Sequence, residues 1–122
     1  MKLLDTNILI YSGEDQYSTL LLPYVIDSNN MVSSISKIET LGFSRITANQ
    51  IHFFNNIFQL IDVLAVNENI IEQAILLRQQ RKMSLGDAII AATALENNAT
   101  LVTRNTSDFD WIIGLELENP FS

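Results

Sequence analysis

Short apolar segments that suit buried strands alternate along this 122-residue sequence with longer segments whose apolar residues recur at helical spacing. Strands are predicted at residues 2–5, 31–34, 61–66, 100–103 and, from a weaker pattern, 115–117. Strands and helices that alternate in this way form a mainly parallel sheet flanked by helices. The pattern therefore predicts an α/β fold with a sheet of four to five strands, whose functional groups gather at the carboxyl ends of the strands.

The segments between these strands have helical patterns. Helices are predicted over residues 17–27, where Pro23 kinks or restarts the helix, over 36–60 with a break near 47–49, and over 68–82 and 85–96. The last helix has a stripe that begins at Leu85 and is apolar nearly all round, so it should be buried. In the second half of 36–60, Ile51, Phe54 and Phe58 share one face.

The chain has the length of one domain, and no repeat, linker or low-complexity tract divides residues 1–122. No apolar run approaches the roughly 18 to 20 residues that cross a bilayer. The first residues lack the apolar core and the cleavage site of a signal peptide. A soluble, cytoplasmic, single-domain protein without a membrane partner is expected.

The chain contains no cysteine, which excludes disulfides, thiolate catalysis and cysteine-based zinc sites. A single histidine, His52, cannot form a histidine-rich metal site and is expected to be an exposed helix residue. Any bound metal must therefore have oxygen ligands. The formal charge of −7 argues against a broad basic face for nucleic acid, unless cations bound among the acids reverse the local field.

Four acidic residues stand where predicted strands end or helices begin: Asp5, Glu39, Asp87 and Asp108. Asp5 closes the first strand and could cap the helix that follows. Glu39 and Asp87 each lie three residues after a serine, as in a capping box. Asp108 lies in a polar loop, where turns favour such residues. Taken singly, capping or turn formation is the simpler interpretation of each acid.

The joint placement of the four acids predicts a metal site, because the carboxyl ends of parallel strands meet at one edge of a sheet. Four carboxylates without basic partners repel one another unless a divalent cation neutralises them. With oxygen ligands alone, Mg²⁺ or Mn²⁺ is the expected ion. Hydrolysis of phosphate esters is a reaction that such sites commonly support.

The basic residues nearest these acids in sequence are candidates for substrate binding. Arg78, Arg81 and Lys82 lie shortly before one of the acids, and Arg104 lies shortly before another. The alternative is a solvated helix end, where cations complement the helix dipole. The sequence leaves both interpretations open.

Four segments surround the acids: LDTNILI at 4–10, SKIETL at 36–41, LGDAIIAATA at 85–94 and LVTRNTSDF at 101–109. They span nearly the whole chain, and they resemble the PIN-domain ribonucleases, in particular the toxins of VapC-type toxin–antitoxin pairs. The last two segments together are highly specific, whereas SKIETL alone is a weak motif. The resemblance implies a PIN-like fold and a metal-dependent endoribonuclease.

By this resemblance, the family's acidic positions are Asp5, Glu39, Asp87 and Asp108, and its supporting polar positions are Thr6, Asn7, Thr103 and Asn105. Some members have Asp at the position of Asn105, so either Asn105 or Asp108 supplies the fourth acidic function, and we favour Asp108. The implied reaction is attack of a metal-activated water on an RNA phosphodiester. Asp5 and Asp87 are the first choices as direct ligands, and Thr103 or Thr6 would fix a carboxylate by a hydrogen bond.

The resemblance also implies three partners for the chain. These are an RNA substrate, a second copy of the chain in a homodimer, and a small antitoxin. VapC-type antitoxins wrap the region that corresponds to the helices of 36–60 and place a basic side chain among the acids. The aromatic residues of this segment, among them Phe54 and Phe58, would provide apolar surface for that contact.

Three other protein classes share some of these sequence features. A receiver domain of a signalling relay needs an Asp at its third strand and a Lys after its fifth, but here the third strand ends in Ala65-Val66-Asn67 and no Lys follows Lys82. A P-loop enzyme needs a Gly-x-x-x-x-Gly-Lys motif, and this sequence contains none. The third rival is a PIN fold that binds partners without cleaving RNA, against which the presence of all four acids argues.

Overall fold

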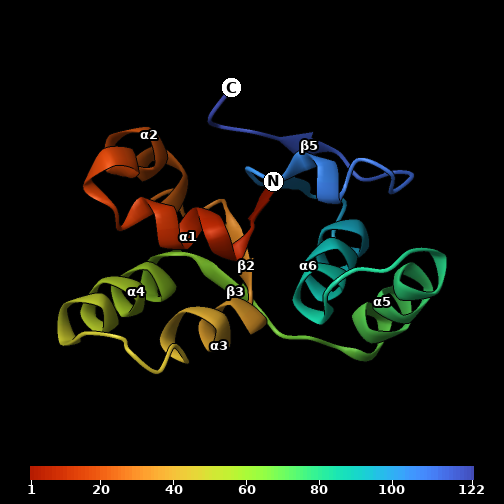
Figure 1. Ribbon diagram of the computed structural model, residues 1–122, viewed down its shortest axis with the longest axis horizontal. Coiled ribbons are helices and arrows are strands. Elements are labelled where there is room, and N and C mark those ends of the chain that lie inside the picture. The colour runs from red at the N-terminus through yellow and green to blue at the C-terminus, as the bar shows by residue number, and fades with distance from the viewer.

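The structure, a computed structural model that describes all of residues 1–122, contains five strands, six α-helices and one short 3-10 helix (Figure 1). The strands are β1 (Lys2–Leu4), β2 (Met31–Ser33), β3 (Asp62–Leu64), β4 (Thr100–Val102) and β5 (Leu117–Glu118). The helices are α1 (Thr6–Ser12), α2 (Asp15–Val25), α3 (Ile35–Leu41), α4 (Ala48–Leu60), α5 (Glu68–Gln80), α6 (Leu85–Glu96) and the 3-10 helix η1 (Thr106–Asp108). No helix combines the length and the hydropathy that crossing a membrane would require.

The five strands form one sheet in the order β3-β2-β1-β4-β5, and every neighbouring pair is parallel. This confirms the predicted α/β class and the parallel sheet. The chain order reverses between β1 and β4, because β2 and β3 extend one side of β1 while β4 and β5 extend the other. Such a switch point leaves a crevice at the carboxyl ends of the two strands, which is where α/β proteins bind ligands.

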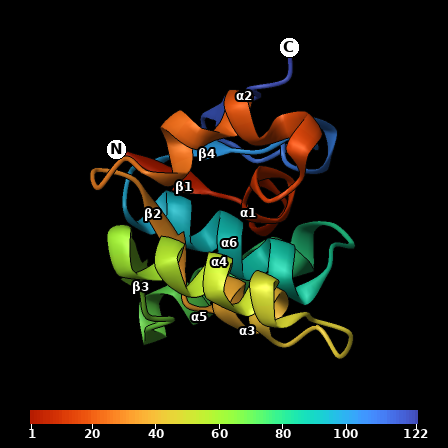
Figure 2. The same ribbon diagram turned by 90° about the vertical axis from the view of Figure 1, so that its left-hand side faces the viewer.

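Two hydrophobic cores lie on opposite faces of the sheet, since successive strand residues point in opposite directions. Leu3 and Leu101 belong to the core beneath α5 and α6, whereas Leu4 and Val102 belong to the core beneath α1, α2 and α4. Figure 1 shows the two groups of helices on either side of the strands, and Figure 2 looks onto the side that α2 and α4 cover. The strands are therefore covered on both faces.

Helix α6 is buried, as predicted, but the stripe expected to begin at Leu85 is wrong at its first position. Leu85 is 59% exposed, whereas Ala91 and Ala94 have no exposed surface. Small side chains let α6 approach its neighbours closely, and it makes its most extensive helix–helix contact with α5. A sequence that is apolar nearly all round gives no period from which to choose the buried face.

The predicted break in residues 36–60 lies earlier than expected. Helix α3 ends at Leu41. Gly42 follows as its C-cap, in a backbone position where a Cβ would collide with the carbonyl oxygen of Ile38. Helix α4 begins after Thr47, whose side chain accepts a hydrogen bond from the Gln50 amide in a capping box.

The buried face of α4 also differs from the predicted one. Phe54 and Ile57 are buried, whereas Ile51 is exposed. In α2, the helix begins two residues earlier than predicted, at Asp15, and continues through Pro23.

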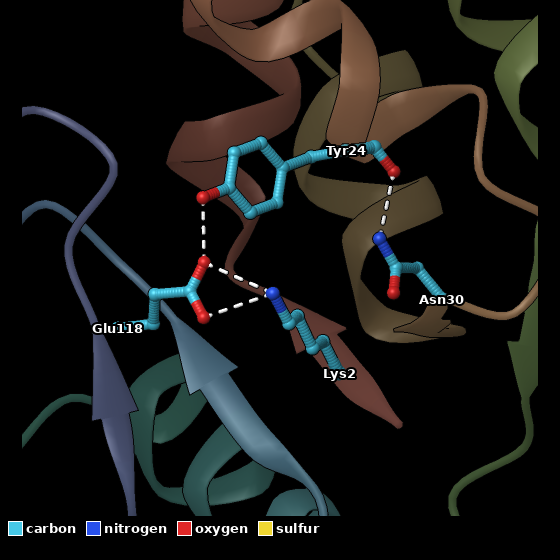
Figure 3. Close-up of polar contacts among 4 residues, drawn as sticks. All are labelled: Lys2, Tyr24, Asn30 and Glu118. Atoms are coloured by element: carbon cyan, nitrogen blue, oxygen red, sulfur yellow. Dashed lines mark hydrogen bonds and ion pairs between the residues drawn. The ribbon is translucent and has the colours of Figure 1, made fainter.

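A polar cluster fastens the C-terminal strand to the other end of the chain. The Glu118 carboxylate of β5 accepts hydrogen bonds from the Lys2 ammonium of β1 and from the Tyr24 hydroxyl of α2 (Figure 3). The Asn30 side chain in turn donates to the Tyr24 carbonyl oxygen. These contacts connect α2 and the edge strand β5 to β1, the central strand of the sheet.

Candidate active site at the carboxyl ends of β1 and β4

Asp5 follows β1 at the switch point of the sheet, and its backbone amide donates to the Val102 carbonyl oxygen. Its carboxylate accepts a hydrogen bond of 2.9 Å from the Thr103 hydroxyl, and the Asn105 amide donates to that same hydroxyl oxygen. Asp5 occupies the N-cap position of α1, but its side chain makes no capping hydrogen bond. The carboxylate is therefore directed to the end of β4 and not to the helix that it precedes.

Burial of Asp5 makes its negative charge unfavourable. The residue is 4% exposed, and this burial is the main cause that raises the pKa of Asp5 to about 6. The negative charges of Asp87 and Glu39 raise the pKa further, while the hydrogen bond from Thr103 and the nearby backbone of Thr6 oppose the shift. Raised carboxylate pKa values of this kind are a mark of functional sites.

Glu39 reaches the site from α3, and the capping-box interpretation of this residue is wrong. The helix begins at Ile35 with Ser34 at its N-cap, so Ser36 does not stand at the helix start. Instead, the Thr6 hydroxyl donates to Glu39 Oε1 at 2.6 Å, and the Ser36 hydroxyl lies 2.8 Å from the Thr6 oxygen. These contacts connect α1 and α3 and hold the Glu39 carboxylate beside the end of β1.

The Glu39 carboxylate also lies against the amino terminus of α6. A Cβ at Gly86 would come within 2.6 Å of Glu39 Oε2, so the carboxylate occupies space that only glycine leaves open. The positive end of the α6 dipole favours a negative charge there. Sequence reasoning missed this role of Gly86, although a glycine in the first turn of an otherwise strong helix is a signal of close approach.

Asp87 lies in the first turn of α6, where the Ser84 hydroxyl accepts a hydrogen bond from its amide, so the predicted helix cap is present. The Asp87 carboxylate is half-buried, and burial is the largest cause of its raised pKa. The Ser84 side chain opposes that shift, and the charges of Asp108 and Glu39 add to it. All four acids are thus linked by their charges, with Asp87 at the centre.

Asp108 ends η1 and is exposed, and it lines the same surface hollow as Asp87. Asn105, the other residue considered for the fourth position, contributes its backbone amide to Thr103. Of these two residues only Asp108 carries a charge, and that charge contributes to the raised pKa of Asp87.

Comparison with known proteins matches residues 2–111 to the PIN domain family. The chain belongs to this family. A chain of a toxin–antitoxin complex from Klebsiella pneumoniae is 32% identical to it, with a TM-score of 0.77 and 98% of each chain covered. VapBC2 from Rickettsia felis, bound to a DNA fragment from its promoter, gives 27% identity, a TM-score of 0.78 and 97% coverage of each chain.

VapBC-1 from nontypeable Haemophilus influenzae is 26% identical, with a TM-score of 0.79, and the alignment covers 99% of this chain and 98% of that one. Curated proteins provide no match. The similarities support a PIN domain of the VapC type, as the sequence motifs predicted. The strand order also rejects the receiver alternative, whose sheet has the order 2-1-3-4-5.

The acids of this PIN domain supply the oxygen ligands that a hard cation prefers, but their carboxylates are not arranged as a complete metal site. No group of three acidic or histidine side chains is close enough together to hold one ion. All available donors are carboxylate, hydroxyl or carbonyl oxygens, which Mg²⁺ and Mn²⁺ prefer. A cation held by Asp5 and Asp87 would also offset the repulsion that adds to burial in raising the pKa of the Asp5 carboxyl.

Among the expected supporting residues, Thr6 and Thr103 each donate to one of the acids. Both hydroxyls are therefore placed to fix a carboxylate rotamer. Asn7 lies in the first turn of α1 and makes no side-chain hydrogen bond. No role for Asn7 follows from its contacts.

The basic residues divide between two places in this PIN domain. Arg81 and Lys82 line a hollow of about 270 Å³ beside the acids, here called the Trp111 hollow, whose lining is Arg81, Lys82, Met83, Ser84, Asp87, Ser107, Asp108 and Trp111. Arg78, in the last turn of α5, donates to the Met83 carbonyl oxygen and so holds the loop that carries these two.

Arg104 lies elsewhere, within an aromatic cluster. Its guanidinium carbon is 5.2, 5.3 and 4.4 Å from the ring centroids of Tyr11, Tyr17 and Phe121. These contacts favour a role in attaching the C-terminal segment, and substrate binding by Arg104 stays a prediction.

Proposed function

We propose that this PIN domain is a cytoplasmic, metal-dependent endoribonuclease that hydrolyses RNA phosphodiesters, and that it is the toxin of a toxin–antitoxin pair. Membership of the PIN family supports nuclease chemistry, and the similar structures support the biological class. The observation that carries the proposal is the grouping of Asp5, Glu39 and Asp87, through their mutual charges, at the switch point of the sheet. The chain has no cysteine, and its single histidine, His52, lies in α4 outside this group.

Each residue of the site has a physical role in this proposal. Asp5 and Asp87 would hold a Mg²⁺ or Mn²⁺ ion, while Glu39 and Asp108 would complete its shell, position a water molecule or hold a second ion. When bound, the cation lowers the pKa of a water molecule and offsets charge on the scissile phosphate. Thr103 fixes the Asp5 carboxylate by its hydrogen bond.

The test is a cleavage assay with Asp5→Asn, whose side chain has nearly the shape of Asp without the charge. We expect this variant to fold and to lose at least about a hundredfold in cleavage rate, because removing one catalytic electrostatic contact commonly costs 10²–10³ in rate. Asp62→Asn is the matched control, since Asp62 is exposed at the amino end of β3, away from the acids. Its cleavage rate should equal that of the wild type.

Two results would contradict the proposal. One is equal cleavage by wild type and Asp5→Asn, and the other is full cleavage by wild type in excess chelator. Failure of the wild type to cleave any RNA with Mg²⁺ or Mn²⁺ present would instead favour the alternative, a PIN fold that binds partners without catalysis.

The partner we propose is a small antitoxin, as in the complexes that the chain resembles. A hollow of about 220 Å³ between α1, α3 and α4, here called the Phe43 groove, is lined by Ile10, Glu39, Thr40, Phe43, Ile46, Gln50 and Phe54. It is largely apolar and has the Glu39 carboxylate among its lining residues, so it suits an apolar segment that carries a basic side chain to the acids. The homodimer stays a prediction from the family resemblance.

A further inference from the structure

The acid cluster has a hollow on each side, and the two differ in chemistry. Glu39 borders the Phe43 groove, which is largely apolar, whereas Asp87 and Asp108 border the Trp111 hollow, which is largely polar. The Trp111 hollow contains one aromatic ring and two basic residues. That combination is the one proteins use to bind single-stranded nucleic acid.

Trp111 is held firmly at the edge of this hollow. Its indole Nε1 donates a hydrogen bond of 2.9 Å to the carbonyl oxygen of Asp108, and part of the side chain packs against the core beneath α5 and α6. The Arg81 guanidinium carbon lies 5.5 Å from the ring centroid. Trp111 is only partly buried and lines the hollow, so its ring offers surface that a planar ligand can reach.

The two cations of the hollow are not neutralised by the acids that share it. The structure contains one ion pair, between Lys2 and Glu118, so neither Arg81 nor Lys82 is paired with Asp87 or Asp108. Unpaired positive and negative side chains therefore both line the hollow. The two free cations can bind a phosphate by charge-assisted hydrogen bonds.

We propose that the Trp111 hollow binds one unpaired nucleotide of a single-stranded RNA next to the bond that is cleaved. The base stacks on Trp111, and Arg81 and Lys82 bind its phosphate. The proposal deepens the proposed ribonuclease function and rests on it. It adds a nucleotide subsite at Trp111 to the acid cluster. Only an unpaired base can use this subsite, because a base inside a duplex is stacked on its neighbours and presents no free face to a tryptophan.

The volume of the Trp111 hollow and the weak contact between Arg81 and the Trp111 ring support this assignment. About 270 Å³ lies just below the roughly 300 to 1,000 Å³ of pockets for drug-sized ligands, so the hollow suits a single nucleotide. Arg81 is exposed, and a cation above an aromatic ring at an exposed site is bound weakly. The arginine can therefore leave the ring for the phosphate when a base takes its place.

Trp111 is the only tryptophan in the chain, so its fluorescence reports on this hollow without any label. A short single-stranded RNA oligonucleotide, titrated into the Asp5→Asn protein with Mg²⁺, should quench the emission in a saturable way. The duplex of the same sequence should quench it much less. An oligonucleotide with abasic sites in place of its bases should bind at least about fivefold more weakly, because it retains the phosphates and loses the stacking.

Two substitutions separate stacking from a structural role of the ring. Trp111→Leu should raise KM for single-stranded RNA by roughly 5- to 150-fold, the value of one base–aromatic stack, and leave kcat nearly unchanged. Trp111→Phe should raise KM much less, because it retains an aromatic face. Both variants lose the hydrogen bond to the Asp108 carbonyl oxygen, so equal damage in the two, expressed in kcat, would show that Trp111 only positions Asp108.

The basic residues are tested by salt dependence. Arg81→Ala and Lys82→Ala should each reduce by about one the slope of log affinity against log salt concentration, as expected for loss of one phosphate contact. Arg45→Ala, at an exposed arginine outside the hollow, is the matched control for the general loss of one positive charge.

The outcomes distinguish this inference from the proposed function. If the wild type cleaves RNA while single-stranded RNA leaves the emission unchanged and Trp111→Leu retains the wild-type KM, the inference is wrong and the ribonuclease stands. If the emission is quenched equally by duplex and single strand, the inference is also wrong. If saturable quenching by single strands occurs and the wild type cleaves no RNA, the binding site stands and the proposed function fails.

Discussion

At the scale of single residues, Gly86 makes room for a carboxylate. Gly86→Ala places a Cβ against the end of the Glu39 side chain, which is flexible and can move away. We expect an unchanged or slightly higher free energy of unfolding, because alanine is the better helix former, together with clearly slower cleavage and weaker Mn²⁺ binding. Chemical denaturation and Mn²⁺ titration measure the two effects.

Gly42→Ala is the contrasting substitution, because its Cβ would meet the backbone carbonyl of Ile38, which cannot move aside. This variant should unfold at lower denaturant concentration, and its remaining folded fraction should bind Mn²⁺ normally. If Gly86→Ala were the less stable of the two and bound Mn²⁺ like the wild type, the role assigned to Gly86 would be wrong.

The pKa of Asp5 leads to a prediction about pH. Because burial raises this pKa from 3.8 to about 6, the protonated form is favoured in the folded state. The associated stability is fully present below pH 3.8 and is lost as the pH rises through about 6, a difference of roughly 3 kcal/mol. Without divalent cations, Asp5→Asn should therefore be the more stable protein at pH 7.5.

The difference between Asp5→Asn and wild type should shrink as the pH falls from about 6 toward 4. Denaturant unfolding in chelator at several pH values measures it. A variant that is less stable than the wild type at pH 7.5 would show that the charged Asp5 supports the fold.

The four acids could be predicted from the sequence because residue type and position at strand ends are visible there. Their local roles could not. Glu39 fits the Ser-x-x-Glu spacing of a capping box, yet the helix begins one residue before Ser36 and the carboxylate instead meets Thr6 and Gly86. The partner of Glu39 is set by how α1, α3 and α6 pack, and no local pattern contains that information.

At the scale of elements, the apolar composition of α6 predicts that the helix is buried, but packing determines which of its residues are buried. Ala91→Leu adds volume where no surface is exposed, so it should cost about 1–3 kcal/mol of stability. Leu85→Gln changes a mostly exposed side chain and should cost less than about 0.5 kcal/mol. Urea unfolding of both variants measures the difference, and a larger loss for Leu85→Gln would contradict the observed orientation of the helix.

The strands and helices could largely be predicted, because apolar periodicity changes between them. Their ends and faces were less predictable. The third strand is Asp62–Leu64 and not 61–66, and the fifth is Leu117–Glu118 and not 115–117. Strands of two or three residues are defined by pairing with neighbours, so their limits depend on the sheet and not on their own sequence.

At the scale of the whole molecule, the two hollows predict that partner and substrate binding can be separated. Phe43 is 55% exposed in the Phe43 groove, so Phe43→Asp should fold, bind an antitoxin at least about tenfold more weakly, and cleave RNA as the wild type does. Phe54→Asp is unsuitable, because Phe54 is 6% exposed and belongs to the core. Light scattering with and without the antitoxin measures the association and also tests the homodimer.

Ile113→Asp is the control, since Ile113 is 97% exposed and lies outside the Phe43 groove. Unchanged antitoxin binding by Phe43→Asp, or a loss shared equally by Ile113→Asp, would place the partner surface elsewhere. A wild-type mass of one chain at high concentration would contradict the homodimer.

The hydrogen bond between Thr103 and Asp5 has a consequence for how the protein is made. It joins residues 98 positions apart, and β1 lies beside β4, which follows it by most of the chain. During synthesis, β1 leaves the ribosome first, and it can pair with β4 only after most of the remaining residues have been synthesised. A nascent chain that has not yet released β4 thus lacks the Thr103 side of its site, and a product of interrupted translation is expected to be harmless to the RNA of the cell that makes it.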